Sequence, residues 1–325
     1  MSENTAPAAP QLPQRQKKGR AGLISAIIGA VVVIAIIVTV IVVVNNKGKS
    51  DDASASTLPA KTVSIGTSDA SSPTWTIYKK LAKEKYNVDI KLVNFSDYSQ
   101  PNPALAQKQI DLNEFQHIEF LAVYNVTNHD DIQPIGATVT VPLPLYSLKY
   151  KNVADLPADA KVAIPNDQVN QARGLLVLQS AGLVTLKNGG TAFSTVNDIE
   201  SSKVKITTLD ASQTATALQT GSVAASIINN NYATLAKLPQ TDVIAKDDPS
   251  SAAAQNYVNF FAARKADAKN KLYLELADLY HNKDVEAAAL KESGNTAVFS
   301  KLTPAELQAA LAKTEADAKA AGIGK

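Results

Sequence analysis

The sequence has little of what most catalytic and metal-binding sites are built from. Its 325 residues include no cysteine, one methionine, one tryptophan and three histidines, and aromatic residues make up 6% of the chain. The absence of cysteine excludes disulfide bridges, iron–sulfur clusters, thiolate zinc sites, cysteine nucleophiles and lipid-modified cysteines. No HExxH, GxSxG, Walker A or GxGxxG motif occurs either, so no enzyme class is indicated. We therefore expect a protein that is not an enzyme and needs no cofactor or metal.

Two acidic pairs and one histidine-containing triplet are the remaining candidates for catalysis or metal binding. Asp51-Asp52 and Asp247-Asp248 each lie in a polar stretch, so we interpret both as solvated turns rather than catalytic carboxylate pairs. His129-Asp130-Asp131 has metal-binding side chains, but a surface loop after a helix is the stronger interpretation. A hydrolase remains the weaker hypothesis.

Charge of either sign is also scarce over most of the chain. The net charge is +2, from 32 Lys and Arg against 30 Asp and Glu. Residues 1–20 contain four basic residues and one acidic residue, residues 21–44 contain no charge, and residues 45–325 therefore carry −1. This near-neutral bulk has no basic excess for a polyanion, so we expect no nucleic-acid partner.

The uncharged run Ala21–Val44 is the one long hydrophobic segment. Its 24 residues, at about 1.5 Å each, suffice to cross a hydrocarbon core of about 30 Å. A signal peptide has a shorter apolar region and a small-residue cleavage site, whereas Asn45-Asn46-Lys47 follows here. We expect an uncleaved, single-pass membrane anchor. The positive-inside rule puts a disordered stub, residues 1–20, in the cytoplasm, and residues 45–59 form a flexible tether outside the cell.

From Lys61 onward, strand-like alternation and helical spacing succeed each other. The expected strands cover residues 62–66, 88–92, 161–164, 205–209 and 223–228. The expected helices cover residues 73–86, 170–181, 211–219, 272–281, 285–291 and 303–320. Strand–helix–strand succession predicts an α/β fold with a largely parallel sheet. A Pro residue and a capping box open the last helix.

Polar residues follow three of these strands, where ligands of open α/β sheets bind. The segments are 94–102, 165–173 and 228–232. Arg173 can hold a carboxylate through two bonds, and the side-chain oxygen of Asn229 can accept a hydrogen bond from an ammonium group. The sequence therefore indicates a site for a small zwitterion.

Each of these residues also has a purely structural interpretation. Arg173 can be a surface arginine, and Asn229 can belong to a turn that tolerates left-handed backbone. His117 can be a hydrogen-bonded core histidine, and Tyr98 and Phe115 can be ordinary core aromatics. These alternatives stay open from the residues alone.

Eight short segments, in a fixed order between Thr62 and Phe299, carry a resemblance to a known family. They are Phe95-Ser96-Asp97-Tyr98, Pro101-Asn102, Asp111-Leu112-Asn113-x-Phe115-Gln116-His117, Leu145-Tyr146-Ser147, Val162-Ala163-Ile164-Pro165-Asn166-Asp167, Arg173-Gly174-Leu175-Leu176, Gln179-x-Ala181-Gly182-Leu183 and Ile228-Asn229-x-x-Tyr232-Ala233. In these segments the chain resembles the methionine-binding lipoproteins of the MetQ/NlpA group, the substrate-binding proteins of methionine ABC importers.

The resemblance implies a type II-like periplasmic-binding-protein fold whose two lobes close on an amino acid. Arg173 would hold the ligand carboxylate and Asn229 the amino-acid head group. The pocket for the ligand side chain would be lined by Tyr98, Phe115, His117 and Phe120. The resemblance also implies two additional ligand contacts, Asn170 and Tyr257.

The resemblance also implies where the chain crosses between the lobes, near 139–146 and 250–257. Lobe 1 would comprise residues 60–140 plus 257–325, and lobe 2 residues 147–250. The family usually carries a lipobox cysteine and often Gly-Pro-His after its first strand. Here the hydrophobic span replaces the first feature, and Ala70-Ser71-Ser72 stands where the second is expected.

The expected function is that of a membrane-anchored, extracellular solute-binding protein. It would deliver L-methionine to an ABC permease and its ATPase subunit, with a monomeric binding domain. Alternatives are the same fold binding another apolar amino acid, a methionine derivative or a short peptide, and a surface adhesin.

Overall fold

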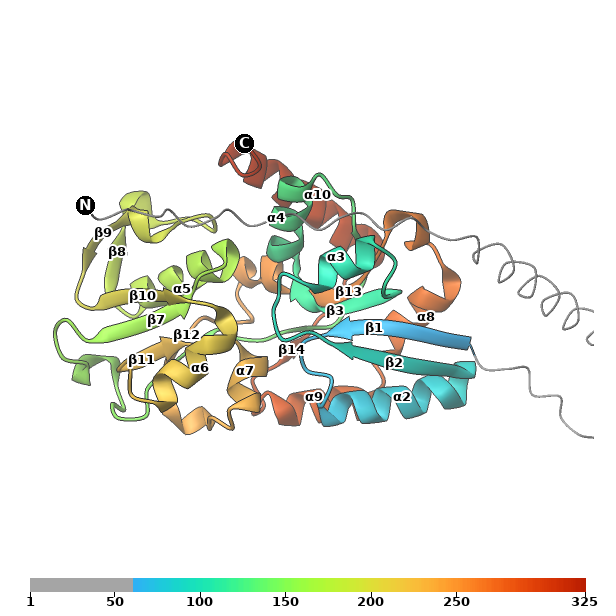
Figure 1. Cartoon of the computed structure of the whole chain (residues 1–325), viewed down its shortest axis with the longest axis horizontal. Coiled ribbons are helices and arrows are strands. Elements are labelled where there is room, and N and C mark those ends of the chain that lie inside the picture. The colour runs from blue at the N-terminus through green and yellow to red at the C-terminus, as the bar shows by residue number, and fades with distance from the viewer. Residues whose placement is uncertain (1–60) are drawn as a thin grey trace, which may run out of the picture. The chain divides into compact units, whose positions relative to one another are not determined.

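The computed structural model describes residues 61–325 (Figure 1). The expected stub, membrane span and tether, residues 1–20, 21–44 and 45–59, lie outside these described residues. Between residues 61 and 325, no helix has the length and apolar character needed to cross a bilayer. Residues 61–325 belong to one compact unit, which contains two five-stranded sheets.

The first sheet has the strand order β2-β1-β3-β13-β4. Its strands are β1 (Lys61–Thr67), β2 (Val88–Asn94), β3 (Leu112–His117), β4 (Gln133–Ala137) and β13 (Asn259–Ala263). The helices packed around it are α2 (Pro73–Tyr86), α3 (Pro101–Ala106), α4 (Ile118–Asn128), α8 (Lys271–Leu279), α9 (Lys283–Glu292) and α10 (Pro304–Ala320). A short ribbon of β5 (Val139–Thr140) and β14 (Val298–Phe299) adjoins this half of the molecule.

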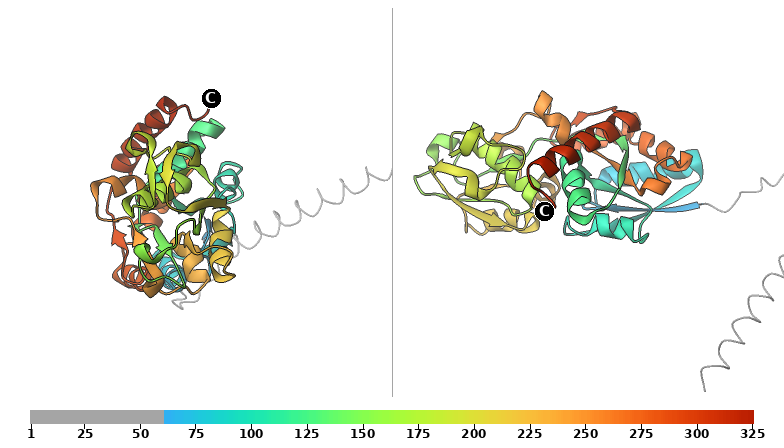
Figure 2. Two further views of the ribbon diagram at one scale, coloured as in Figure 1. Left: turned by 90° about the vertical axis from the view of Figure 1, so that its left-hand side faces the viewer. Right: turned by 90° about the horizontal axis from the view of Figure 1, so that it is seen from above.

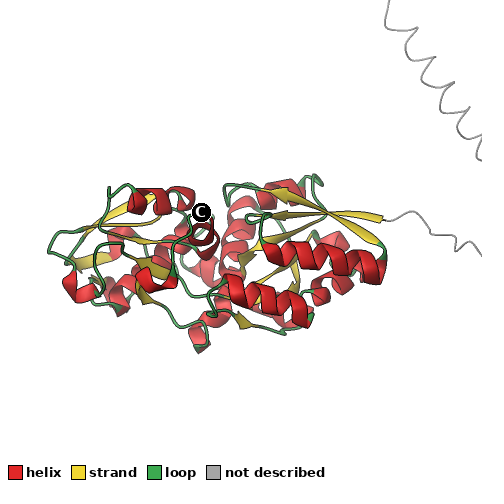
Figure 3. Cartoon of the chain, turned by 90° about the horizontal axis from the view of Figure 1, so that it is seen from below, coloured by secondary structure: helices red, strands yellow, loops and turns green. Residues whose placement is uncertain are grey.

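The second sheet has the order β10-β7-β11-β6-β12. Its strands are β6 (Pro144–Tyr146), β7 (Lys161–Pro165), β10 (Lys205–Leu209), β11 (Ala225–Ile227) and β12 (Val243–Lys246). The associated elements are helices α5 (Gln168–Ser180), α6 (Ala211–Gln219) and α7 (Asn230–Leu235), and the hairpin of β8 (Val184–Leu186) and β9 (Ile199–Ser202). Figure 3 shows helices flanking the strands of both sheets.

One strand in each sheet runs against the other four. β1, β2 and β3 are parallel, and so are β7, β10 and β11. β13 is antiparallel to both of its neighbours, as is β6. The two reversed strands are those that the chain enters after passing from one sheet to the other. The prediction of largely parallel sheets is therefore confirmed, with the reversal confined to the strands that follow a crossing.

The pattern of buried residues explains the first strand–helix unit. Val63 and Ile65 alternate into the core at 3% and 0% exposure and pack with Trp75 and Tyr78 of α2. The helix begins at Pro73, which occupies a position where no backbone donor is needed. It ends where the next residue adopts left-handed backbone. The expected helix over 73–86 is confirmed in both bounds.

The C-terminal helix α10 completes the first half of the molecule. Thr303 and Glu306 form the predicted capping box, with the Thr303 hydroxyl 2.7 Å from a carboxylate oxygen of Glu306. Leu307 and Leu311 are at most 2% exposed in a core shared with α4. Figure 2 shows α10 in red along the outside of α4. The helix therefore covers apolar surface of this half.

Candidate functional site

A cavity of about 400 Å³ lies where the carboxyl ends of strands from both sheets meet. The ends of β1, β3 and β11 supply lining residues, including Thr67, His117 and Asn229. The segment before β6 and the first residue of β13 supply Leu143 and Asn259. Its size falls in the range of about 300–1,000 Å³ typical of small-molecule sites. The parallel strands bring together side chains that are far apart in the sequence.

A polar cluster at the N-termini of two helices forms one wall of the cavity. Asp167 caps α5, and its Oδ1 accepts hydrogen bonds from the backbone N–H and the side-chain amide of Asn170, at 2.9 and 3.0 Å. Asn229, which caps α7, donates from Nδ2 to Oδ1 of Asn170 at 2.9 Å. The Oδ1 atom of Asn229 is buried and has no hydrogen-bond partner among residues 61–325. This acceptor needs a donor that a bound molecule can supply.

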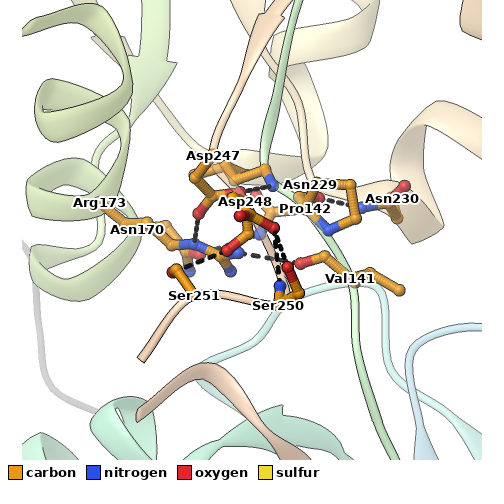
Figure 4. A network of polar contacts seen from close by, with 11 residues as sticks. Val141, Pro142, Asn170, Arg173, Asn229, Asn230, Asp247, Asp248, Ser250 and Ser251 are labelled. Atoms are coloured by element: carbon orange, nitrogen blue, oxygen red, sulfur yellow. Dashed lines mark hydrogen bonds and ion pairs between the residues drawn. The ribbon is translucent and has the colours of Figure 1, made fainter. Parts of the chain in front are cut away.

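Arg173 is fixed by three contacts beside this cluster, and Figure 4 shows the two that involve Asp247 and Val141. Its Nε donates to Oδ2 of Asp247 at 2.6 Å, and its Nη2 donates to the carbonyl oxygen of Val141 at 2.9 Å. The guanidinium lies 4.1 Å from the centre of the Tyr257 ring. Nη1 makes no hydrogen bond to any residue between 61 and 325. Because Arg173 lines the cavity at 5% exposure, this nitrogen is available to a carboxylate. The surface-arginine interpretation is wrong.

The solvated-turn interpretation of Asp247 is also wrong. In addition to Arg173, its carboxylate accepts a 2.7 Å hydrogen bond from the backbone N–H of Leu143. Its neighbour Asp248 is exposed and accepts from Ser250. The interpretation therefore holds for Asp248 only. The partner of Asp247 lies 74 residues away in the sequence, which no local pattern reveals.

His117 lies at the end of β3 and caps α4. Its Nδ1 accepts from the backbone N–H of Phe120 at 3.4 Å. Burial, together with the nearby charge of Arg173, lowers the pKa of His117 to about 3. The ring is therefore neutral at pH 7, and its proton resides on Nε2. At 7% exposure it lines the cavity as a hydrogen-bond donor rather than as a cation.

Three aromatic side chains form the apolar part of the cavity wall. The ring centres of Tyr98 and Phe115 are 6.1 Å apart, and Phe120 lies 5.7 Å from Phe115 and 6.1 Å from Tyr98. Aromatic faces and edges of this kind suit an apolar or sulfur-containing side chain. The core-aromatic interpretation fails for Tyr98 and Phe115, because both are only half-buried and line the cavity.

Tyr98 and its neighbours also connect the two sheets. The Tyr98 hydroxyl donates to Oδ1 of Asn231, whose Nδ2 donates to Oγ of Ser68 at 3.2 Å. Tyr232 donates to the carbonyl oxygen of Ser96 at 3.0 Å. These contacts join the loops after β1 and β2 to helix α7.

The structure brings seven of the eight predicted site residues to the cavity surface. They are Tyr98, Phe115, His117, Phe120, Asn170, Arg173 and Asn229. The eighth, Tyr257, does not line the cavity, but its ring contacts the guanidinium of Arg173 and packs edge-on against His117. Sequence reasoning missed three carboxyl side chains that also line the cavity, from Asp69, Glu114 and Glu292.

Fold and cavity together define a two-lobe substrate-binding protein. The chain belongs to the NlpA lipoprotein family, whose model matches residues 63–301. The D-methionine-binding lipoprotein MetQ of Yersinia pestis is 36% identical over 225 residues, which are 68% of this chain and 82% of that protein. The D-methionine-binding lipoprotein MetQ of Escherichia coli is 35% identical over 225 residues, which are again 68% of this chain and 82% of that protein.

Solved structures give the same assignment. The substrate-binding protein of a methionine transporter from Streptococcus pneumoniae is 35% identical with a TM-score of 0.67, over 74% of this chain and 95% of that one. A nutrient-binding protein from Burkholderia cenocepacia, solved bound to methionine, is 36% identical with a TM-score of 0.68, over 73% and 99%. The predicted family is confirmed.

Proposed function

We propose that this chain is the substrate-binding protein of an ABC importer and binds L-methionine in the cavity between the two sheets. The observation that carries this proposal is the pairing of two unused groups in one cavity. Nη1 of Arg173 is free to donate, and Oδ1 of Asn229 is buried and free to accept. A zwitterionic head group would supply a carboxylate to the first and an ammonium to the second.

The aromatic wall supports a thioether as the ligand side chain. Sulfur contacts with aromatic edges are favourable, and Tyr98, Phe115 and Phe120 line the same cavity. Relatives named for methionine binding are consistent with this choice. None of these groups has to act as an acid, a base or a nucleophile, so we propose binding and delivery without turnover.

Calorimetry and thermal unfolding of residues 59–325 with a panel of L-methionine, D-methionine, methionine sulfoxide and L-leucine test the proposal. L-Methionine at 100 times its dissociation constant should add about 2.7 kcal/mol to the free energy of unfolding. Arg173→Gln should abolish most of this gain. The matched control is Arg264→Gln, because Arg264 is also paired, with Asp267 at 2.7 Å, but lies outside the cavity. No stabilisation by any member of the panel would refute the proposal.

We further propose that residues 60–140 plus 257–325 and residues 147–250 move as two lobes. The assignment of strands to two separate sheets supports this division, because β1–β4 and β13 form one sheet and β6, β7 and β10–β12 form the other. Strand β6 pairs within the second sheet, which would leave residues 139–143 as the first crossing. Small-angle scattering should show a smaller radius of gyration when the ligand is added. An unchanged radius would argue against closure.

For membrane attachment, we propose residues 21–44 as a single-pass anchor that holds a monomeric binding domain outside the cell, next to the permease and its ATPase. The uncharged run and the preceding basic cluster support this orientation. Deleting residues 21–44 should release the protein from the membrane fraction. Protease added to intact cells should digest the full-length domain, and full protection would contradict the orientation.

A further inference from the structure

The cavity extends beyond the proposed head-group site to a set of acidic side chains. Asp69 follows β1, Glu114 lies within β3, and Glu292 is the last residue of α9, and all three line the same cavity. They come from sequence positions more than 40 residues apart. The fold therefore gathers three carboxyl groups at a place where a ligand has access.

Neutral donors, not cations, hold these carboxyl groups in place. Asp69 accepts from Nε1 of Trp75 at 2.8 Å and from the Thr67 hydroxyl through the same oxygen. Glu114 accepts from the Thr138 hydroxyl at 3.0 Å. Glu292 accepts from the hydroxyls of two residues at the start of α2. None of the ion pairs formed between residues 61 and 325 includes any of the three.

Glu114 is the member that points most directly to a ligand. It is 9% exposed, and its Oε2 makes no hydrogen bond with any of the described residues. Burial and the neighbouring charge of Asp69 raise its pKa to about 8. An unpaired buried carboxylate is costly, whereas a cation inside the cavity would offset that cost.

A metal ion is a poor match for this site. The side chains of residues 61–325 form no group of three acidic or histidine ligands close enough to share a metal. An ammonium group fits better, because it is a cation with three N–H donors and does not need three carboxyl ligands around one point. The basic residues that line the cavity are Arg173, held by Asp247, and Lys237.

We propose that Asp69, Glu114 and Glu292 form an acidic compartment of the cavity that receives an ammonium group of the ligand, in addition to its amino-acid head group. This inference rests on the proposed function, because it takes Arg173 and Asn229 as the head-group site. The ammonium can belong to a cationic side chain or to the free N-terminus of a short peptide. Both sources present the same chemistry to the three carboxylates.

Two pairs of ligands that differ in one charge distinguish these sources. L-Lysine is compared with L-norleucine, and alanyl-methionine with its N-acetyl derivative, by calorimetry on residues 59–325 at pH 8. In at least one pair, the charged member should bind at least tenfold more tightly than the neutral one. Equal affinities within both pairs would overturn the inference, even if methionine itself binds. Binding of a charged member without binding of methionine would instead refute methionine as the ligand.

Variants connect the effect to the compartment. Glu114→Gln and Asp69→Asn should each reduce the ratio between the charged and the neutral ligand toward one. Glu119→Gln serves as the matched control, because Glu119 is buried at 1% exposure but does not line the cavity. A ratio that survives both cavity variants would place the ammonium elsewhere.

The pH dependence provides a separate readout. The titratable groups around Glu114 are Asp69 from the loop after β1 and the hydroxyls of Tyr78 and Tyr280. Both tyrosines have a pKa well above 10, so they stay neutral. Between pH 6 and 8, the lysine-to-norleucine ratio should rise as Glu114 loses its proton, and lysine binding should release protons into the buffer. A ratio independent of pH in this range would remove Glu114 from the compartment.

Discussion

Glu119 is predicted to make the free binding domain less stable as the pH rises. This residue of α4 is 1% exposed, and no residue between 61 and 325 makes a hydrogen bond of good geometry to either carboxylate oxygen, although the side chain of Asn256 lies close enough to interact with the carboxylate. Burial raises its pKa from 4.5 to about 7, and the side chain of Asn256 opposes part of that shift. Glu119→Gln should remove the pH-dependent penalty, because the amide has nearly the shape of the protonated acid and never ionises.

The sign and size follow from the two pKa values. Between pH 4.5 and 7 the folded state retains the proton and the unfolded state loses it, so the free energy of unfolding falls as the pH rises. The difference of about 2.5 pKa units corresponds to about 3 kcal/mol. Below pH 4.5 the wild type and the variant should be equally stable, and above pH 7 the variant should be more stable by about 3 kcal/mol.

Urea unfolding of residues 59–325 at pH 4.5 and pH 8 measures this difference. Comparing the two proteins at each pH cancels the titration of all other groups, including Glu114, whose raised pKa acts in the same direction. Glu84→Gln is the control, because Glu84 is an exposed member of a surface pair with Lys80 at 3.8 Å and should change stability little at either pH. An identical effect of Glu119→Gln at both pH values would refute the reasoning.

Three further substitutions test the ion pair of Arg173, the packing of the first sheet and the cap of α10. Asp247→Ala leaves the guanidinium of Arg173 buried without its partner at 2.6 Å and should lower the free energy of urea unfolding by about 3 kcal/mol; a loss below 1 kcal/mol would contradict this. Gly136→Ala places a methyl carbon 2.6 Å from Cβ of Ala277 and should cost about 1–3 kcal/mol, which Ala277→Gly in the same chain should partly restore. Thr303→Ala removes the capping box of α10 and should lower the free energy of unfolding by about 1 kcal/mol. An unchanged free energy of unfolding would mean that the N-terminal end of α10 is frayed and that the cap does not stabilise it.

Local patterns were sufficient to predict the secondary structure over much of the chain. Alternation over 62–66 and the Pro73 start identify β1 and α2, because both signals depend on neighbouring residues. The expected helix over 170–181 begins two residues earlier, because Asp167 caps it. The predicted strand over 223–228 is shorter in the structure, where β11 spans Ala225–Ile227.

The sequence predicted only those residues of the candidate site that lie near strand ends or within family motifs. Asn229 lies two residues after β11, and Arg173 lies in α5, the helix that follows β7, so the rule that ligands bind at the carboxyl ends of strands locates both regions. Asp247 and Glu114 were missed for a different reason. Their roles depend on what faces them across the fold: Arg173 for the first, and Asp69 for the second. Sequence spacing carries no information about such pairs.

The position of Asp247 connects the proposed head-group site to the proposed crossings between the lobes. Asp247 follows β12, a few residues before the proposed second crossing, and its carboxylate holds both Arg173 and the backbone of Leu143, which lies just before β6. Arg173 in turn holds the carbonyl oxygen of Val141 in the proposed first crossing. A ligand carboxylate on Nη1 would therefore share its guanidinium with contacts to both crossings. Because a ligand shifts a conformational equilibrium only through contacts that differ between the two states, this shared guanidinium is where binding and lobe closure can be coupled.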